Sequence, residues 1–322
     1  MVKEHFEALD SVSLNLGGGA GIVMSIVLGL IMFGIALGIS KETLKNVFLQ
    51  PKSLITGLAL QWIGLPLVTF LLIILIHRWI TPMVALGMIL VASCPGGNVS
   101  NFISSLSKGN TELSIGMTAV ATIFAPVVTP FNFWAWGNAY LRFARLSDVM
   151  ILPHIQIPFG EVFETVFIIL GIPIVLGMLF ANYLPGITAK IRKPFSVFSI
   201  IVFIAMVLGM FIPNWQIFLE YIFVIFVLVL VHNACAFGTG YLGATLMKLP
   251  MADRKSITIE VGIQNSGLGL TMLLNPAIFD PQIWSNEQSG VMYGGMLFVT
   301  AWWAIWHIIS GLGLASLFRR CR

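Results

Sequence analysis

The sequence contains few charged residues and few cysteines. Only 9% of its 322 residues are Asp, Glu, Lys or Arg, while 58% are hydrophobic, and the mean hydropathy is +0.96. A soluble domain has about 25% charged residues, so this composition excludes one and predicts a multi-pass α-helical membrane protein. The three cysteines imply no disulfide framework, because Cys94 and Cys235 fall inside apolar segments and Cys321 lies at the C-terminal end.

Patterns typical of enzymes and receptors are also missing. The chain has no Ser-His, Asp-Asp or His-Glu-x-x-His arrangement and no polar stretch long enough for a domain outside the membrane. We therefore expect neither an enzyme nor a receptor. The net charge of +4 is explained by the placement of basic residues around the membrane, so we expect no nucleic-acid partner and no obligatory protein partner.

The first 20 residues differ from a cleaved signal peptide. They carry Glu4, Glu7 and Asp10 and many glycines, instead of a basic start followed by an apolar core. We expect residues 1–20 to form an extracellular or periplasmic segment and the first apolar stretch to remain in the mature protein.

Apolar stretches long enough to cross a bilayer recur along the chain. About 20 apolar residues are needed for each crossing, and on this measure we count about nine spans. They are predicted at 21–39, 54–76, 82–106, 112–134, 159–184, 195–212, 215–247, 256–274 and 290–318.

The basic residues are distributed unequally between the two sides of this nine-span arrangement. One side has Lys41, Lys45, Lys52, Lys108, Lys190, Arg192, Lys193, Lys248, Arg254, Lys255, Arg319, Arg320 and Arg322. The other side keeps Lys3, Arg78, Arg142 and Arg145. Because cytoplasmic loops are rich in Lys and Arg, we predict a cell-membrane protein with its N-terminus outside and its C-terminus in the cytoplasm.

Two of the spans are interrupted near their middles. The third contains Cys94-Pro95-Gly96-Gly97-Asn98, and the eighth contains Glu260 followed by Gly262, Gln264 and Asn265. An acid within a span is costly and indicates a functional site. The two breaks run in opposite directions across the membrane, so their segments are related by inverted topology. This arrangement is typical of a secondary transporter that binds its cargo where the broken helices cross and works by alternating access.

The polar groups near the breaks are oxygen ligands. Amide, hydroxyl and backbone oxygens surround a single acid, with no His or Cys cluster nearby, and this set favours a hard cation over a transition metal. One carboxylate favours a monovalent ion over calcium, and sodium is our first choice. An organic anion would balance the charge of two sodium ions and the positive ends of the half-helices. The sequence thus predicts sodium-coupled import of an anion.

At these residues the chain resembles the bile acid:sodium symporter family, over nearly all the spans from 21 to 318. Within this family, it resembles the bacterial homologues of the apical sodium-dependent bile acid transporter. The resemblance implies an all-α fold built from inverted repeats. Two broken helices would cross in a core domain at 54–134 and 215–318. A panel domain would comprise 21–39 and 159–212, with a cytoplasmic tail at 319–322.

The resemblance also implies roles for individual residues. The first sodium site would comprise Ser100, Asn101, Ser114, Thr118 and Glu260. The second would comprise Gln61, Glu260, Gln264 and the carbonyls of Val261 and Ile263. We expect substrate contacts from Asn265, Gly96, Gly97 and Asn98. The substrate would be a bile acid, a sulfated steroid, pantoate or a similar carboxylate.

One alternative function and two histidines remain open. A sodium/proton antiporter of related broken-helix fold is disfavoured, because such exchange usually needs a pair of titrating acids and the spans offer only Glu260. His232 and His307 also lie within spans, and we interpret them as hydrogen-bonded packing residues.

Overall fold

The computed structural model describes residues 2–10, 20–39, 45, 51–97, 99–147, 157, 159–212, 215–275, 278–279, 285–286, 290–291 and 294–320. Nearly all of this is helix. The first half contains α1 (Val2–Asp10), α2 (Ala20–Ala36), α4 (Pro51–Ala59), η1 (Leu60–Gly64), α5 (Leu65–Ile76), α6 (Pro82–Ser93), α7 (Val99–Leu106) and α8 (Thr111–Leu146). The second contains α9 (Phe159–Val166), η2 (Phe167–Gly171), α10 (Ile172–Tyr183), α11 (Pro185–Phe211), α12 (Trp215–Leu246), α13 (Met251–Gly262), α14 (Ser266–Leu273) and α15 (Gly294–Arg320), with two short strands, β1 (Ser285–Asn286) and β2 (Gly290–Val291).

The helices confirm the predicted class, an all-α polytopic membrane protein. Among the described residues, five continuous helices are long and apolar enough to cross a membrane: Pro51–Ile76, Thr111–Leu146, Val162–Tyr183, Leu219–Leu246 and Gly294–Arg320. Shorter apolar helices lie at Ser25–Ala36 and Pro82–Ser93. The second of these is short because its apolar stretch is interrupted, as the sequence predicts.

Both interruptions follow from local sequence. The α6 helix ends at Ser93, and Cys94 is extended with ψ 154°, as expected of a residue before proline. In the other broken helix, α13 ends at Gly262 and Ile263 is extended, with φ −114° and ψ 96°. The Asn265 side chain then accepts a hydrogen bond from the Leu268 amide at 3.2 Å and caps α14.

Proline also shapes the long helix that begins at α4. A proline removes the amide that would bond to the carbonyl four residues earlier, so Pro66 cannot bond to the Trp62 carbonyl. The helix widens into the π-turn η1 at this point, and Asn132 of α8 donates to the Trp62 oxygen at 2.9 Å. Gln61, one of the predicted sodium ligands, lies in this turn.

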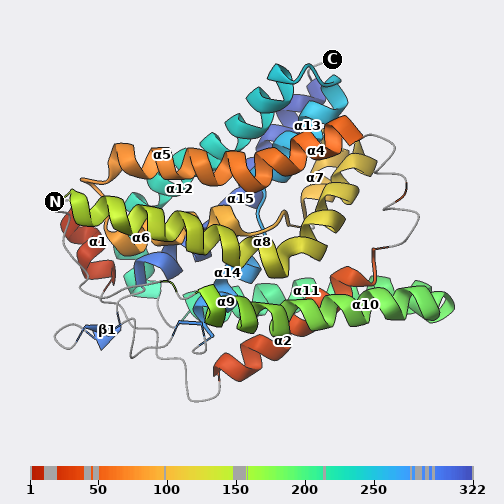
Figure 1. The fold of residues 1–322 in the computed structure, drawn as a ribbon, viewed down its shortest axis with the longest axis horizontal. Helices are drawn as coiled ribbons and strands as arrows, with labels where there is room; N and C mark the ends of the chain where they lie inside the picture. Colours follow the sequence, from red (N-terminus) through yellow and green to blue (C-terminus); the bar gives the residue numbers. More distant parts are fainter. Residues whose placement is uncertain are drawn as a thin grey trace.

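The helices form two groups (Figure 1). One group contains α2, α9, η2, α10 and α11, which lie together along the lower side of the view. The other group, which contains both broken helices, lies above it and includes α4 to α8 and α12 to α15. Contacts of α8 with α9 and η2, and of α14 with α2, join the two groups. This grouping resembles the predicted panel and core, and that domain division remains a prediction.

Two helices extend beyond the expected spans. The α8 helix continues past Trp134 to Leu146 and includes Pro126 and Pro130, because proline is tolerated in membrane helices when neighbours satisfy the freed backbone groups. Arg142 and Arg145, which we expected in a loop, therefore lie on α8. Likewise, α11 begins at Pro185, ten residues before the expected span, and includes the basic residues at 190–193.

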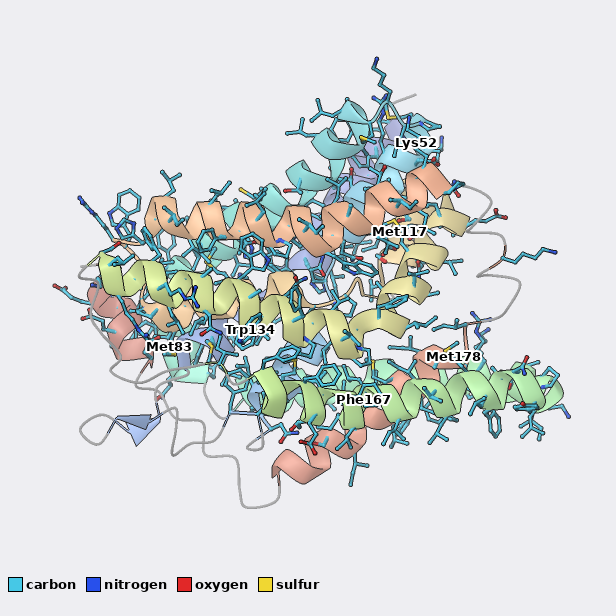
Figure 2. The ribbon with its side chains drawn as sticks, in the orientation of Figure 1. Lys52, Met83, Met117, Trp134, Phe167 and Met178 are labelled. Atoms are coloured by element: carbon cyan, nitrogen blue, oxygen red, sulfur yellow. The ribbon has the colours of Figure 1, made fainter. Side chains whose placement is uncertain are left out.

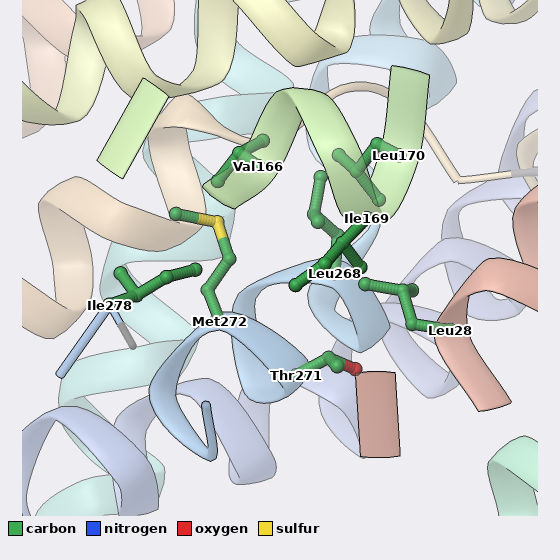
Figure 3. A pocket seen from close by; sticks show the side chains of 8 residues that line it. All are labelled: Leu28, Val166, Ile169, Leu170, Leu268, Thr271, Met272 and Ile278. Atoms are coloured by element: carbon green, nitrogen blue, oxygen red, sulfur yellow. The ribbon is translucent and has the colours of Figure 1, made fainter. Parts of the chain in front are cut away.

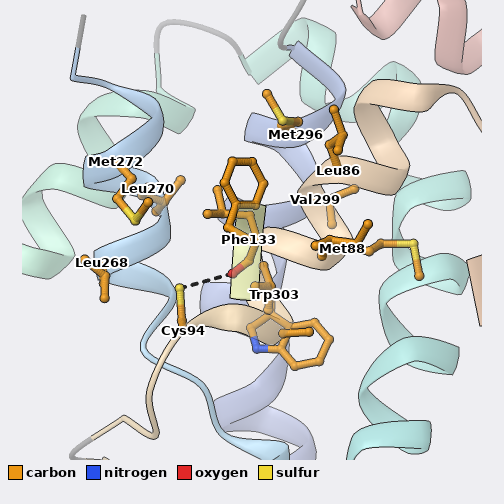
Figure 4. Close-up of a cluster of buried hydrophobic side chains, with 14 of the residues drawn as sticks. Leu86, Met88, Cys94, Phe133, Leu268, Leu270, Met272, Met296, Val299 and Trp303 are labelled. Atoms are coloured by element: carbon orange, nitrogen blue, oxygen red, sulfur yellow. Dashed lines mark hydrogen bonds between the residues drawn. The ribbon is translucent and has the colours of Figure 1, made fainter. Parts of the chain in front are cut away.

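Packing around the breaks is dense. Phe133, Met296 and Trp303 are fully buried together with Cys94, whose thiol donates to the Leu90 carbonyl at 3.3 Å (Figure 4). Cys94 is thus a small packing residue. Elsewhere Trp134 of α8 packs against Phe159 of α9, with ring centroids 5.5 Å apart, and joins the two groups of helices (Figure 2).

Both span histidines are buried. His232 is fully buried, with its Nε2 atom 2.8 Å from the Thr69 hydroxyl and its ring beside Trp303 at 4.7 Å between centroids. His307 is 4% exposed. The surroundings of His232 agree with a packing role.

Candidate functional site

The two breaks cross and pair with each other through their backbones. The Gly97 amide donates to the Ile263 carbonyl at 2.9 Å, and the Asn265 amide donates to the Pro95 carbonyl at 2.7 Å. These bonds make an isolated antiparallel bridge between Gly96 and Gln264. Buried backbone groups must be hydrogen-bonded, and here each break supplies partners that the other lacks.

The Glu260 carboxylate lies at the centre of this crossing and is fully buried. Ser100 of α7 donates to its Oε1 atom at 2.5 Å, and Ser114 of α8 donates to the same oxygen. Thr118, one turn further along α8, lies 3.1 Å from both carboxylate oxygens. A single acid therefore meets three hydroxyls from two other helices.

Asn101 joins the same cluster from α7. Its Oδ1 atom lies 2.9 Å from the Ser114 hydroxyl and 3.2 Å from the Thr118 hydroxyl, and each hydroxyl can give its single proton either to Asn101 or to Glu260. All five side chains implied for the first sodium site are thus connected by hydrogen bonds.

The second predicted set includes two glutamines that bond to the backbone of Glu260 and of Val261. Gln61 donates from Nε2 to the Glu260 carbonyl at 3.3 Å, and Gln264 donates from Nε2 to the Val261 carbonyl at 2.8 Å. The Oε1 atoms of both glutamines are buried and have no hydrogen-bond partner among the residues that the structure describes. Unpartnered amide oxygens are suitable ligands for a hard cation.

The glycines of the first break allow this close approach. A Cβ atom on Gly96 would lie 2.7 Å from Glu260 Oε2 and 2.8 Å from Gln61 Nε2, and one on Gly97 would lie 3.3 Å from the Gln264 carbonyl oxygen. Any larger residue at Gly96 would occupy space between the acid and the amide. Asn265 lies at the crossing and caps α14, while Asn98 lies outside the described residues.

The oxygen ligands of this site suit a hard cation rather than a transition-metal ion. No group of three or more His, Cys, Asp or Glu side chains that could hold a metal is found in the described part of the chain. The hydroxyl oxygens of Ser100, Ser114 and Thr118 keep lone pairs in addition to the protons they donate. Each hydroxyl can rotate to direct a lone pair toward a cation beside the carboxylate, without backbone movement.

One residue at the site, Asn233, carries no signal in the sequence. Asn233 of α12 donates to the Gly262 carbonyl at 2.8 Å, at the point where α13 ends. In the sequence it is a single amide within a long apolar segment, far from both breaks. Only its position in space connects it with the site.

A small apolar pocket lies between the two groups of helices, near the second break (Figure 3). Residues of α2, of the α9–η2 segment and of α14 line it, and the polar oxygen in the lining belongs to Thr271. The lining residues are Leu28, Val166, Ile169, Leu170, Leu268, Thr271, Met272 and Ile278. Its cavity volume of about 10 Å³ leaves room for roughly one water molecule, so the groups are closely packed in this conformation.

A second polar cluster ties helices together at the end of the molecule near α7. The Asp253 carboxylate of α13 accepts from the Ser53 hydroxyl at 2.5 Å and from Asn110 Nδ2 at 2.8 Å. Ser256 donates to the Asn110 carbonyl at 2.9 Å. These bonds join α4, α13 and the start of α8, so this acid is held by neutral donors from two other elements.

The fold and the crossing together define a polytopic helical membrane protein with a buried, oxygen-rich site between two broken helices. Residues 25–221 match the family described as the Sodium Bile acid symporter family, and this match covers more than half of the chain. The protein belongs to that family.

Similar proteins occur in distant organisms. The chain is 32% identical to the uncharacterized sodium-dependent transporter YocS of Bacillus subtilis, over 92% of this chain and 83% of that protein. It is 32% identical to the P3 protein of Homo sapiens, over 72% of this chain and 46% of that longer protein. It is 24% identical to the ileal sodium/bile acid cotransporter of Cricetulus griseus, over 84% and 72% of the two chains.

Proposed function

We propose that the protein is a sodium-coupled symporter that imports a small organic anion. The observation that carries this proposal is the Glu260 carboxylate, fully buried among the hydroxyls of Ser100, Ser114 and Thr118 where two broken helices cross. Neutral hydroxyls compensate a buried carboxylate only in part, and a cation would supply the rest. The family of the chain supports the choice of ion, as do the names of two relatives, the sodium-dependent transporter YocS and the ileal sodium/bile acid cotransporter.

Two sodium ions account for the oxygen ligands at the crossing. Ser100, Asn101, Ser114, Thr118 and Glu260 would bind one ion. Gln61, Glu260, Gln264 and the carbonyls of Val261 and Ile263 would bind the other. The unpartnered Oε1 atoms of Gln61 and Gln264 support this second assignment.

The anion follows from charge. Two sodium ions beside one carboxylate leave a net positive charge, to which the half-helix that begins at Ser266 adds the partial charge of its N-terminus. A carboxylate or sulfate of the cargo would neutralise it. Gly96, Gly97, Asn98 and Asn265 are the proposed contacts, and bile acids, sulfated steroids, pantoate and related carboxylates are the proposed class.

Transport would proceed by movement of the two groups of helices relative to each other. The close packing around this pocket, whose cavity volume is about 10 Å³, requires that the interface open for a cargo as large as a steroid. We place the protein in the cell membrane, in bacteria the inner membrane, with its N-terminus outside, its basic loops inside and alternating access between the two sides.

Thermal unfolding in sodium and in potassium tests the proposal without knowledge of the cargo. A ligand that binds only the folded state raises its stability, so sodium should raise the midpoint of the wild type more than potassium at equal ionic strength. Glu260→Gln removes the charge and keeps the size, and should abolish the difference. Glu112→Gln, which removes an exposed acid at the start of α8, should retain it.

Equal midpoints of the wild type in the two salts would refute sodium binding. Where sodium is selective, proteoliposomes with an inward sodium gradient then test uptake of candidate anions. Sodium-driven proton movement without anion uptake would instead identify an antiporter.

A further inference from the structure

The unwound segment of α13 leaves backbone carbonyls that can no longer bond within a helix, and each of them has a partner. The Val261 oxygen accepts from the Gln264 side chain at 2.8 Å, and the Ile263 oxygen accepts from the Gly97 amide at 2.9 Å. Both partners belong to the crossing itself. The carbonyl between them, of Gly262, is different because its partner is Asn233 of α12.

Asn233 is itself held from a third helix. Its side chain is 1% exposed, and its Nδ2 atom donates to the Gly262 oxygen at 2.8 Å. Its Oδ1 atom lies 2.6 Å from the Ser310 hydroxyl of α15, which also lies 3.2 Å from the His307 carbonyl. Since Ser310 donates on one side and Gly262 accepts on the other, the orientation of the amide is fixed.

The backbone of α13 approaches α12 very closely at this point. A Cβ atom on Gly262 would lie 2.1 Å from Cδ1 of Phe237, which is one helical turn after Asn233 on α12. One turn earlier on α13, a Cβ atom on Gly240 of α12 would lie 2.8 Å from the Thr258 Cα atom. The Phe237 ring thus packs against the Cα atom of Gly262, and the Asn233 amide binds its carbonyl.

We propose that Asn233, oriented by Ser310, is a positioning residue of the sodium site. By binding the Gly262 carbonyl toward α12, it keeps the flanking carbonyls of Val261 and Ile263 directed toward the crossing. This inference rests on the proposed function, because those two carbonyls are ligands only if sodium binds there. Asn233 contributes geometry and does not itself contact the ion.

Three variants separate this role from general support of the fold. Asn233→Leu replaces the amide by an apolar side chain of similar size, and Ser310→Ala removes only the group that orients the amide. Thr300→Val is the matched control, because Thr300 is fully buried on α15 and donates only within its own helix, to the Met296 carbonyl at 2.8 Å. Glu260→Gln reports on the site itself.

The measurement is the thermal midpoint of each full-length variant during titration with sodium chloride, with potassium chloride keeping the ionic strength constant. Loss of one hydrogen bond that orients a ligand should raise the half-saturating sodium concentration about tenfold in Asn233→Leu, and about threefold in Ser310→Ala. Thr300→Val should keep the wild-type value, even if its midpoint in potassium is lower.

The possible outcomes distinguish the inference from the proposal beneath it. If Glu260→Gln abolishes the sodium response while Asn233→Leu and Ser310→Ala keep the wild-type half-saturation, Asn233 only supports the fold and the inference is overturned. Should Asn233→Leu fail to fold, Ser310→Ala decides by the same criterion. A wild type that does not respond to sodium overturns the proposed function, and the inference falls with it.

Discussion

The docking of the N-terminal helix should depend on pH through Asp10. Phe6, Leu9 and Asp10 of α1 are buried against the rest of the protein, and a Cβ atom on Gly295 would lie 2.2 Å from an Asp10 carboxylate oxygen. Burial raises the pKa of Asp10 from 3.8 to about 8, although hydrogen bonds from Thr81 and the Gly295 backbone oppose the rise. The docked carboxyl group is thus protonated at pH values where the free one is ionised.

The sign of the effect follows from proton linkage. Between pH 3.8 and about 8, docked α1 binds more protons than undocked α1, so docking weakens as the pH rises through this window. From pH 6 to pH 8 the docking free energy weakens by about 2.3 kcal/mol, which is roughly fiftyfold in the docking equilibrium. The negative charge of Glu7 also raises the pKa of Asp10, as burial does.

Hydrogen–deuterium exchange of residues 2–10 measures this docking directly. Asp10→Asn keeps the shape of the side chain and removes its titration, and comparison of the two proteins at each pH cancels the intrinsic pH dependence of exchange. We expect similar protection at pH 6 and stronger protection of the variant at pH 8. Equal protection of the two proteins at pH 8 would refute the role assigned to Asp10.

The remaining predictions concern stability. Gly262→Ala should lower the thermal midpoint by an amount equivalent to about 1–3 kcal/mol, because its Cβ atom would lie 2.1 Å from Phe237. Gly313→Ala is the control, because a Cβ atom there would have nothing within 4 Å. An equal effect of the two substitutions would contradict the packing argument. Asp253→Ala should cost about 2–4 kcal/mol, because the buried Ser53 hydroxyl and the half-buried Asn110 amide lose this acceptor. Asp253→Asn, which keeps one acceptor oxygen, should cost less, and a larger loss in Asn than in Ala would count against this explanation.

The sequence predicts most of the helix positions and the location of the crossing. The hydropathy of a bilayer-length stretch can be read from local sequence. Two such apolar stretches are interrupted, one by Pro95 and Gly96 and the other by Glu260 and Gly262. Both breaks are found in the structure within a few residues of their predicted places. The ligand roles of the surrounding residues remain predictions, although the structure brings the predicted side chains together.

Other features depend on contacts that local sequence does not encode. The continuation of α8 beyond Pro130 depends on neighbouring helices, and sequence favoured an end near Trp134. The burial of Asp10 depends on Gly295, almost the whole chain away. Asn233 is a single amide beside His232, and nothing local indicates that its partner is the Gly262 carbonyl.

The antiparallel bridge between the breaks has a consequence for how the protein is made. Gly97 and Pro95 find their backbone partners in Ile263 and Asn265, which the ribosome adds more than 160 residues later. Until then, the first broken helix must enter the bilayer with exposed amide and carbonyl groups, a costly state in hydrocarbon. A chain that stops before Glu260 should therefore resist stable integration of its third span and become a substrate for membrane proteases.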